Sequence, residues 1–169
     1  MAKPKQILYS QPYDANKFTI QYMAFRESML APKGNKTPMF HYALVDALTG
    51  DNKEQIVESF RGSAKSTTVT CDLPIYLAMF GKAEWFEGDI NYALIVSETS
   101  TQAEDLVKEI MFTYDESEAL QAAMQVTKSN RNELEFKIGD RYFNIVAKGA
   151  GQSMRGIKRR GNRPQIILV

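Results

Sequence analysis

The residues at positions 61–67, Arg-Gly-Ser-Ala-Lys-Ser-Thr, have the types and the order that binding of a phosphate chain requires. Such a site needs backbone N–H groups that point inward and the N-terminus of a helix behind them. Gly62, Ser63 and Ala64 are small enough to form a tight loop. Lys65 would contact the β and γ phosphates of a nucleotide, because a lysine at this point of a phosphate loop reaches the outer phosphates.

The two residues after this lysine carry the hydroxyl groups that a bound metal ion needs. Ser66 would coordinate Mg²⁺, and Thr67 follows it directly. The strict glycine pattern fails at two positions, which Ser59 and Ala64 occupy. Alanine at the second position loses freedom at positive φ but adds little bulk. The residues alone leave a second interpretation open, a plain strand-to-helix turn that carries a surface lysine.

A basic loop, residues 149–163, is the second candidate for chemistry. No acidic residue interrupts its positive side chains, which are Arg155, Lys158, Arg159, Arg160 and Arg163. Three interpretations are open: a solvated loop, a contact with the phosphate backbone of nucleic acid, or an arginine finger supplied to a neighbouring subunit. The net charge of +1 favours a few arginines with geometric roles over a broad surface that coats DNA.

The elements predicted around residues 61–67 have the order strand, loop, helix. A strand is predicted over residues 55–60, and a helix over residues 67–80 follows the loop. Pro74 either kinks this helix or opens a separate helix at its first turn. Before this unit, residues 1–17 read as an arm or loop, and helices are predicted over residues 18–30 and 40–48.

The second half of the chain alternates strands and helices. The apolar run 92–96 is typical of a strand buried on both faces of a parallel sheet. The remaining elements are a helix over 99–114, a polar stretch over 115–132 with a short helix at 119–124, a hairpin of strands 133–138 and 141–147, and a last strand over 164–169. This alternation predicts a layered α/β domain with parallel strands.

The composition sets limits on the protein class. Hydrophobic residues make up 44% and charged residues 24% of 169 residues, which allows an ordinary core and argues against a disordered chain. The one cysteine, Cys71, excludes an internal disulfide and suits a reducing cytosol, and with the one histidine, His41, it argues against structural zinc. No apolar run approaches the roughly 20 residues that span a membrane, and residues 1–10 lack the apolar part of a signal peptide.

The order and spacing of several segments resemble the ATPase domain of the large terminase subunit of tailed bacteriophages. Residues 58–67 resemble its variant Walker A motif, in which an arginine comes early in the loop. The other matching segments are 38–41, which leads into the helix before the motor core; 95–103, the second strand and its turn; 149–163, the loop before Walker B; and 164–169, the Walker B strand. Together they cover roughly residues 38–169.

The resemblance implies an α/β fold of the P-loop NTPase type, an incomplete ASCE or RecA-like parallel-sheet core with flanking helices. Residues 1–37 would be an N-terminal arm and helix, and residues 38–169 a partial ATPase domain. The implied function is ATP hydrolysis that drives double-stranded DNA into a procapsid. The implied partners are DNA, the portal protein, the small terminase subunit and further copies of the chain in a homo-oligomeric ring, in the host cytoplasm and transiently on the procapsid.

The resemblance also assigns roles to single residues. It implies that Lys65 is the Walker A lysine, that Ser66 is the Mg²⁺ ligand, and that Arg61 contacts the γ phosphate of ATP. It also implies that Arg155, Arg159 or Arg160 of the basic loop supplies an arginine finger to the ATP of a neighbouring subunit. His41 would lie near the adenine side, although a packed or surface histidine is the alternative. The implied nucleotide site comprises Arg61, Gly62, Ser63, Ala64, Lys65, Ser66 and Thr67.

The sequence departs from the family at its last residue, Val169, where the Walker B acids would follow. We therefore expect this chain to be a piece of a longer protein that is the ATPase. In the piece itself hydrolysis would be weak or lost, because the acidic base and metal ligands are missing. A different class of function is a non-catalytic nucleotide-binding or docking module that contacts the portal or the small terminase subunit. A helicase-like ATPase or a small kinase is a further alternative, but the sequence shows neither a second motor domain nor a lid.

Overall fold

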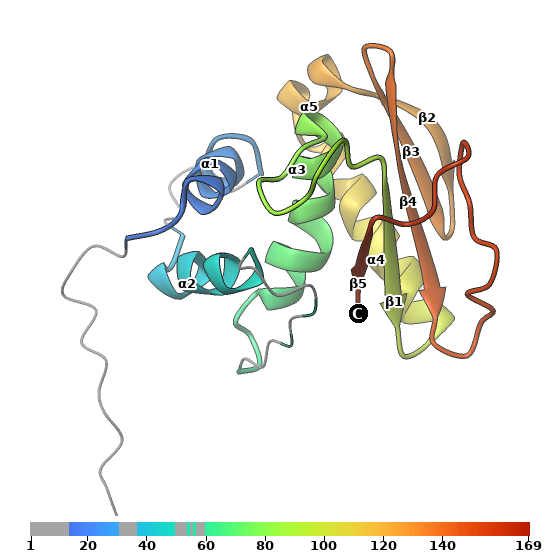
Figure 1. Ribbon diagram of the computed structural model, residues 1–169, viewed down its shortest axis with the longest axis horizontal. Helices are drawn as coiled ribbons and strands as arrows, with labels where there is room; N and C mark the ends of the chain where they lie inside the picture. The colour runs from blue at the N-terminus through green and yellow to red at the C-terminus, as the bar shows by residue number, and fades with distance from the viewer. Residues whose placement is uncertain (1–13, 31–36, 50–53, 55, 57–59) are drawn as a thin grey trace, which may run out of the picture.

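The computed structural model describes residues 14–30, 37–49, 54, 56 and 60–169. Its centre is a five-stranded sheet with the strand order β2-β3-β4-β1-β5 (Figure 1). In chain order the elements are α1 (Lys17–Phe25), the π-helix η1 (Arg26–Leu30), α2 (Met39–Leu48), the π-helix η2 (Thr67–Asp72), α3 (Leu73–Phe80), β1 (Tyr92–Ser97), α4 (Ser100–Asp115), α5 (Glu118–Ala123), β2 (Gln125–Asn130), β3 (Glu133–Ile138), β4 (Arg141–Gly149) and β5 (Ile166–Leu168).

The sheet is mixed. Strand β1 pairs in parallel with β4 on one side and with β5 on the other. Strands β2, β3 and β4 form an antiparallel meander. The prediction of an α/β chain is confirmed, but the parallel core extends over β4, β1 and β5, and the other two strands are antiparallel.

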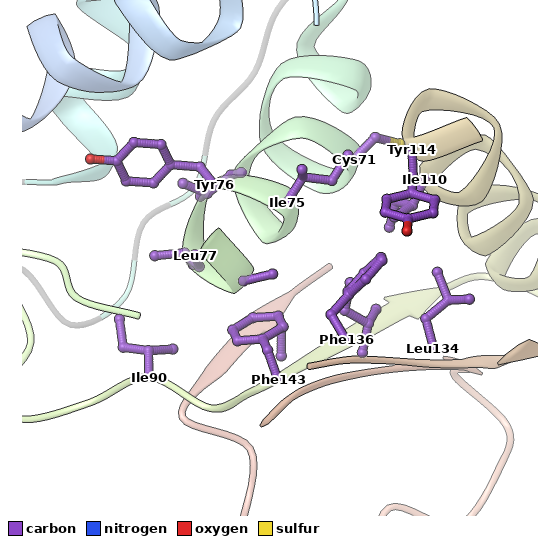
Figure 2. Close-up of a cluster of buried hydrophobic side chains, with 14 of the residues drawn as sticks. Cys71, Ile75, Tyr76, Leu77, Ile90, Ile110, Tyr114, Leu134, Phe136 and Phe143 are labelled. Carbon is purple, nitrogen blue, oxygen red and sulfur yellow. The ribbon is translucent and has the colours of Figure 1, made fainter. Parts of the chain in front are cut away.

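The main core lies between one face of the sheet and helices α3 and α4. Figure 2 shows Ile75 and Ile110 from the helices above Phe136 and Phe143 from the sheet, and all four are fully buried. Burying a large apolar side chain contributes about 1.5–3 kcal/mol. Burial on this face therefore fixes the helix that follows residues 61–67 on the sheet.

Helix α1 joins this core through an aromatic cluster. The Phe18 ring lies edge-on to Tyr76 of α3, with ring centroids 5.2 Å apart, and edge-on to Trp85 at 4.3 Å. Tyr22 also contacts Tyr76 edge-on, at 5.3 Å. Edge-to-face pairs of this kind contribute about 0.5–1.5 kcal/mol beyond the area that they bury. Helix α1 is thus fixed on the outer side of α3.

The opposite face of the sheet is covered by the basic loop, which follows β4. Tyr92, Leu94 and Val146 are buried on this face, and Ile157 of the loop packs against them. Because β1 is buried on both faces, its run of consecutive apolar residues is accounted for, as the sequence predicts.

Most of the predicted elements are present. The helices predicted over 18–30, 40–48, 99–114 and 119–124, the hairpin and the last strand correspond to α1 with η1, α2, α4, α5, β3 with β4, and β5. Strand β2 was not predicted, because the stretch 115–132 is polar. Pro74 lies in the first turn of α3, at a point where η2 runs into α3 without a break in the helical backbone. Most of the strand predicted over residues 55–60 lies outside the described residues, and Ile56 and Phe60, which are described, have no regular secondary structure.

Candidate phosphate-binding loop

Residues 61–67, named the phosphate loop for their predicted role, alternate in backbone conformation before they enter a helix. Gly62 has φ 83° and Ala64 has φ 53°, so both lie in the left-handed region, and helical backbone begins at Lys65. Backbone of this kind can turn successive N–H groups to one side and form an anion-binding concavity. Among the described residues, and apart from the two adjacent ones, no atom lies within 4 Å of the position that a Cβ at Gly62 would take.

The hydrogen bonds within the loop make it a defined turn. Ser63 N–H donates to Phe60 O at 3.3 Å, and Thr68 N–H donates to Ala64 O at 2.9 Å as the first helical turn closes. Figure 1 shows the loop at the end of the molecule where β1 and β4 terminate. Ligands of open α/β sheets bind outside the carboxyl ends of the strands. The loop therefore lies where a ligand of such a sheet is expected.

The side chains of the loop differ in their surroundings. Arg61 and Ser66 are exposed, and Lys65 is half-buried. Thr67 is tied to the neighbouring helix, because its hydroxyl donates to Glu109 Oε1 of α4 at 3.2 Å. The structure thus leaves the Arg61 and Ser66 side chains open to solvent and uses Thr67 to anchor the helix start.

A cavity of about 820 Å³ adjoins the start of this helix and is lined by Lys65 and Ser66. Strand β5 forms another part of its wall, and an aromatic part comes from α1 and from the loop before β1. The aromatic lining residues are Phe18, Tyr22, Trp85 and Phe86. The lining of the cavity thus combines polar residues at the helix start with apolar and aromatic residues.

Behind the loop lies His41 of α2, which is 4% exposed. Its Nε2 is 2.7 Å from the carbonyl oxygen of Ser63, and the residue Ser63 is also buried, with 5% of its surface exposed. The sequence allowed a histidine near the adenine side or a packed or surface histidine. The structure shows a packed histidine that contacts the backbone of the loop.

Three further polar residues support the helix after the loop, and the sequence did not point to them. The Tyr22 hydroxyl donates to Thr68 O, and Arg26 Nε donates to Asp72 Oδ2 at 2.7 Å. Burial raises the pKa of Asp72 above its ordinary value, although the Arg26 guanidinium acts in the opposite direction. Both contacts join residues 46 positions apart, so a local pattern could not show them. The available signal was that Asp72 is the one charged residue in the sequence 67–80.

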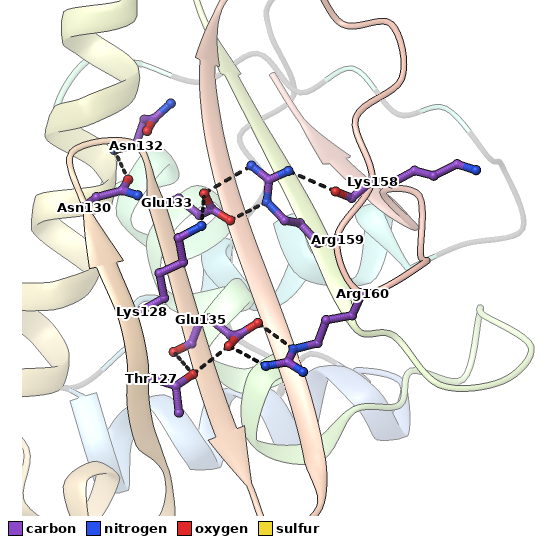
Figure 3. A network of polar contacts seen from close by, with 9 residues as sticks. All are labelled: Thr127, Lys128, Asn130, Asn132, Glu133, Glu135, Lys158, Arg159 and Arg160. Atoms are coloured by element: carbon purple, nitrogen blue, oxygen red, sulfur yellow. Dashed lines mark hydrogen bonds and ion pairs between the residues drawn. The ribbon is translucent and has the colours of Figure 1, made fainter.

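The basic loop is fixed to the sheet by two paired arginines (Figure 3). Arg159 donates from Nε and Nη2 to the two carboxylate oxygens of Glu133, the second bond at 3.1 Å. Arg160 makes the same fork to Glu135, at 2.8 and 3.0 Å, and its guanidinium stacks 3.6 Å from the Tyr142 ring centroid. Two-point arginine–carboxylate bonds are among the stronger polar contacts in proteins.

These pairs change the titration of both carboxyl groups. Burial alone would raise the pKa of Glu133, but hydrogen bonds from Arg159 and Lys128 outweigh it and hold the pKa below its ordinary value. The hydrogen bond from Arg160 lowers the pKa of Glu135. The two glutamates, which lie on β3 beneath the loop, are therefore stabilised as anions.

The predicted residues fall into two groups on opposite faces of the sheet. The phosphate loop, with Arg61 and Lys65, precedes the helix that packs on one face. Arg159 binds Glu133 on the other face, and Arg155 of the same loop is exposed. The structure brings Lys65 and Ser66 together, but it does not bring the two arginines of the basic loop to them.

The chain matches no protein-family model, and no curated protein or solved structure is found to be similar to it. Within the described ranges, no helix is both long and apolar enough to cross a bilayer. The same part of the chain holds no cluster of three or more His, Cys, Asp or Glu side chains placed as metal ligands.

Proposed function

We propose that this chain is the ATP-binding part of a motor that moves double-stranded DNA into a procapsid, as large terminase subunits do. The observation that carries the nucleotide site is the backbone of the phosphate loop. Left-handed residues at Gly62 and Ala64 lead directly into a helix that starts with Lys65 and Ser66. Phosphate groups are stabilised at such a place by N–H groups and by the positive end of the helix dipole.

In this proposal each side chain of the loop has a separate task. Lys65 contacts the β and γ phosphates, and Arg61, which is exposed, reaches the γ phosphate. Ser66 fits a magnesium ion, because its hydroxyl is an exposed oxygen donor at the first turn of the helix and Mg²⁺ prefers oxygen ligands. A Mg²⁺ ion held by Ser66 would neutralise part of the charge on the phosphate oxygens.

The DNA-packaging part of the proposal rests on the order of the sequence motifs. The partners that it requires are DNA, the portal protein, the small terminase subunit and further copies of this chain in a ring, in the host cytoplasm and on the procapsid. Arg155 is exposed, whereas Arg159 and Arg160 are held in ion pairs with Glu133 and Glu135. In this proposal Arg155 is therefore the finger candidate that can reach a neighbouring subunit without breaking an ion pair.

The ion pairs also favour a second candidate function, nucleotide binding without turnover in a docking module for the portal or small terminase subunit. Two of the three finger candidates neutralise carboxylates of their own chain. Stabilising charge on a transferring phosphoryl group would require either arginine to leave its partner. A chain that binds ATP and releases no phosphate would support this second function.

The proposal is tested by titrating a fluorescent ATP analogue into the chain with Mg²⁺. We expect saturable binding that Lys65→Ala weakens at least about tenfold, because a hydrogen bond to a charged group contributes about 1.5–3 kcal/mol. Lys108→Ala is the matched control, since Lys108 is exposed and pairs with Asp105 on the outer surface of α4. Thermal unfolding monitored by circular dichroism checks that both variants fold.

Two results would contradict ATP binding at this loop: no saturation by the folded wild-type chain, or equal affinities of the Lys65 and Lys108 variants. Phosphate release from ATP, measured on the same samples, separates a motor from a module that binds without turnover.

A further inference from the structure

The one histidine of the chain holds the phosphate loop from behind. His41 Nε2 lies 2.7 Å from Ser63 O in a buried contact between α2 and the loop. A carbonyl oxygen can only accept a hydrogen bond, so Nε2 is the nitrogen that carries a proton and donates it. The other ring nitrogen, Nδ1, is buried without a hydrogen-bond partner among the described residues.

This bond fixes the orientation of the peptide group between Ser63 and Ala64. The described part of the chain contains no cis peptide bond, and in a trans peptide the C=O and N–H groups point in opposite directions. Because His41 draws the Ser63 carbonyl toward α2, the N–H of Ala64 points away from α2. Residues on both sides of Ser63 have left-handed φ, 83° at Gly62 and 53° at Ala64, so the orientation of this peptide decides the shape of the loop.

The donor itself is firmly placed. His41 lies in the first turn of α2, where its own N–H donates to Pro38 O at 3.0 Å. The ring of the preceding residue, Phe40, lies 4.2 Å from the His41 ring and 5.6 Å from the Phe60 ring, which immediately precedes the phosphate loop. The histidine is therefore fixed on a helix, and the glycine-containing loop is the part that it orders.

We propose that His41 is a positioning residue for anion binding. Its hydrogen bond to Ser63 O sets the direction of the Ala64 N–H before a phosphate group arrives, and His41 itself does not touch the nucleotide. A donor that is already oriented does not have to be ordered on binding, so the affinity is higher than for a loop whose peptide rotates freely. This inference rests on the proposed function of residues 61–67 and explains how the free chain keeps the loop ready.

The test uses three substitutions of His41 that differ in where they place an N–H donor. In His41→Gln the amide nitrogen can reach the place of Nε2, whereas in His41→Asn it reaches only the place of Nδ1. His41→Phe keeps a ring but has no donor. With the fluorescent ATP analogue and Mg²⁺, we expect the Phe and Asn variants to bind about fivefold to tenfold more weakly than wild type, and the Gln variant to stay within about twofold.

A second measurement follows the loop itself. Long-range ¹H–¹⁵N spectra of the single histidine should show a proton on Nε2 in the free chain. With ¹⁵N-alanine labelling, the Ala64 amide signal should shift on addition of inorganic pyrophosphate in wild type and His41→Gln, and much less in His41→Phe. Thermal unfolding of each variant separates this effect from loss of the fold.

The outcomes distinguish this role from the proposed function. If His41→Phe binds as tightly as wild type while Lys65→Ala has lost binding, the role of His41 is wrong and the nucleotide site stands. If the Gln and Phe variants are equally weak, the hydrogen bond is not the cause and the inference is also overturned. If the wild-type chain shows the Nε2 proton but binds neither the analogue nor pyrophosphate, the proposed nucleotide site and the role of His41 are both overturned.

Discussion

At the scale of single residues, Ala64 is a strained position. It is an exposed alanine with φ 53°, a region that costs a non-glycine residue about 1–2 kcal/mol. The strict phosphate-loop pattern has glycine here, so the sequence departure and the backbone strain occur at the same residue. The helix that starts at Lys65 and the turn at Ser63 hold Ala64 in this conformation.

We predict that Ala64→Gly raises the free energy of unfolding by about 0.5–1 kcal/mol, because glycine adopts positive φ without a steric penalty. Urea denaturation measures the change. Ala119→Gly is the matched control: Ala119 is exposed within helix α5, where the same substitution should lower stability by about 0.5–1 kcal/mol. Destabilisation by both substitutions would contradict the strain at Ala64.

The sequence identified the residues that could meet a ligand but not those that support them. Lys65 and Ser66 follow one another, so their types and spacing predict a role directly. The Arg26–Asp72 pair and the contact of Tyr22 with Thr68 span 46 positions each, and they exist because α1 docks on the helix after the loop. Long-range contacts of this kind depend on the fold and leave no local pattern.

At the scale of elements, the end of β4 lies directly against the start of α4 at Gly149. A Cβ added to Gly149 would lie 2.5 Å from Ser100 N and 2.9 Å from Thr99 C. Both neighbours are backbone atoms at the start of α4, so a flexible side chain cannot yield the space. The glycine is required by space, since no positive φ is found there.

Gly149→Ala should therefore lower the free energy of unfolding by about 1–3 kcal/mol, the usual cost of overpacking. Gly151→Ala provides the control, because no atom lies within 4 Å of its Cβ position and substitutions at such sites change stability by less than about 0.5 kcal/mol. Urea denaturation of the two variants side by side measures the difference. Equal stabilities would mean that β4 and α4 can separate freely.

The elements differ in how well the sequence predicts them, and the reason is burial. Strand β1 and helix α4 carry continuous or periodic apolar residues because they face the core, so both were predicted close to their observed bounds. Strand β2 forms an edge of the sheet, and nearly all of its side chains are exposed. Its polar residues pair with β3 through backbone hydrogen bonds, which side-chain patterns do not record.

At the scale of the whole molecule, the basic loop closes the second face of the sheet through Glu133 and Glu135. The pKa of each is lower in the folded protein than its ordinary value, so each stabilises the fold above pH of about 4.3 and loses this contribution as the pH falls through the lowered pKa. Asp72 acts in the opposite direction, because its raised pKa favours the folded state at low pH. The two glutamates face Lys128, Arg159, Arg160 and Thr127.

We predict that the free energy of unfolding falls between about pH 5 and pH 3, and that the double variant Glu133→Gln with Glu135→Gln shows a smaller fall. Denaturation by urea at several pH values measures both slopes. Asp105→Asn is the control, since Asp105 pairs with Lys108 on an exposed surface where such bonds contribute little. The prediction is wrong if the double variant keeps the wild-type dependence on pH.

The architecture was predicted in class but not in arrangement. Alternating helices and strands indicate an α/β chain, and this is what the structure shows. The packing of the basic loop on the face of the sheet opposite α3 and α4 could not be predicted. Arg159 and Glu133 are 26 positions apart, and the loop between β4 and β5 has no periodic pattern. The same limit applies to the cavity beside Lys65, whose walls come from α1, α2, β5 and the loop before β1.

The aromatic cluster at α1 has a consequence for optical experiments. Trp85 is the only tryptophan of the chain, contacts Phe18 at 4.3 Å, and lines the cavity that begins at Lys65. All tryptophan fluorescence therefore originates at one wall of this recess. Its emission wavelength and lifetime report both the docking of α1 and the polarity of whatever enters the cavity, so the unlabelled chain carries its own spectroscopic reporter beside the phosphate loop.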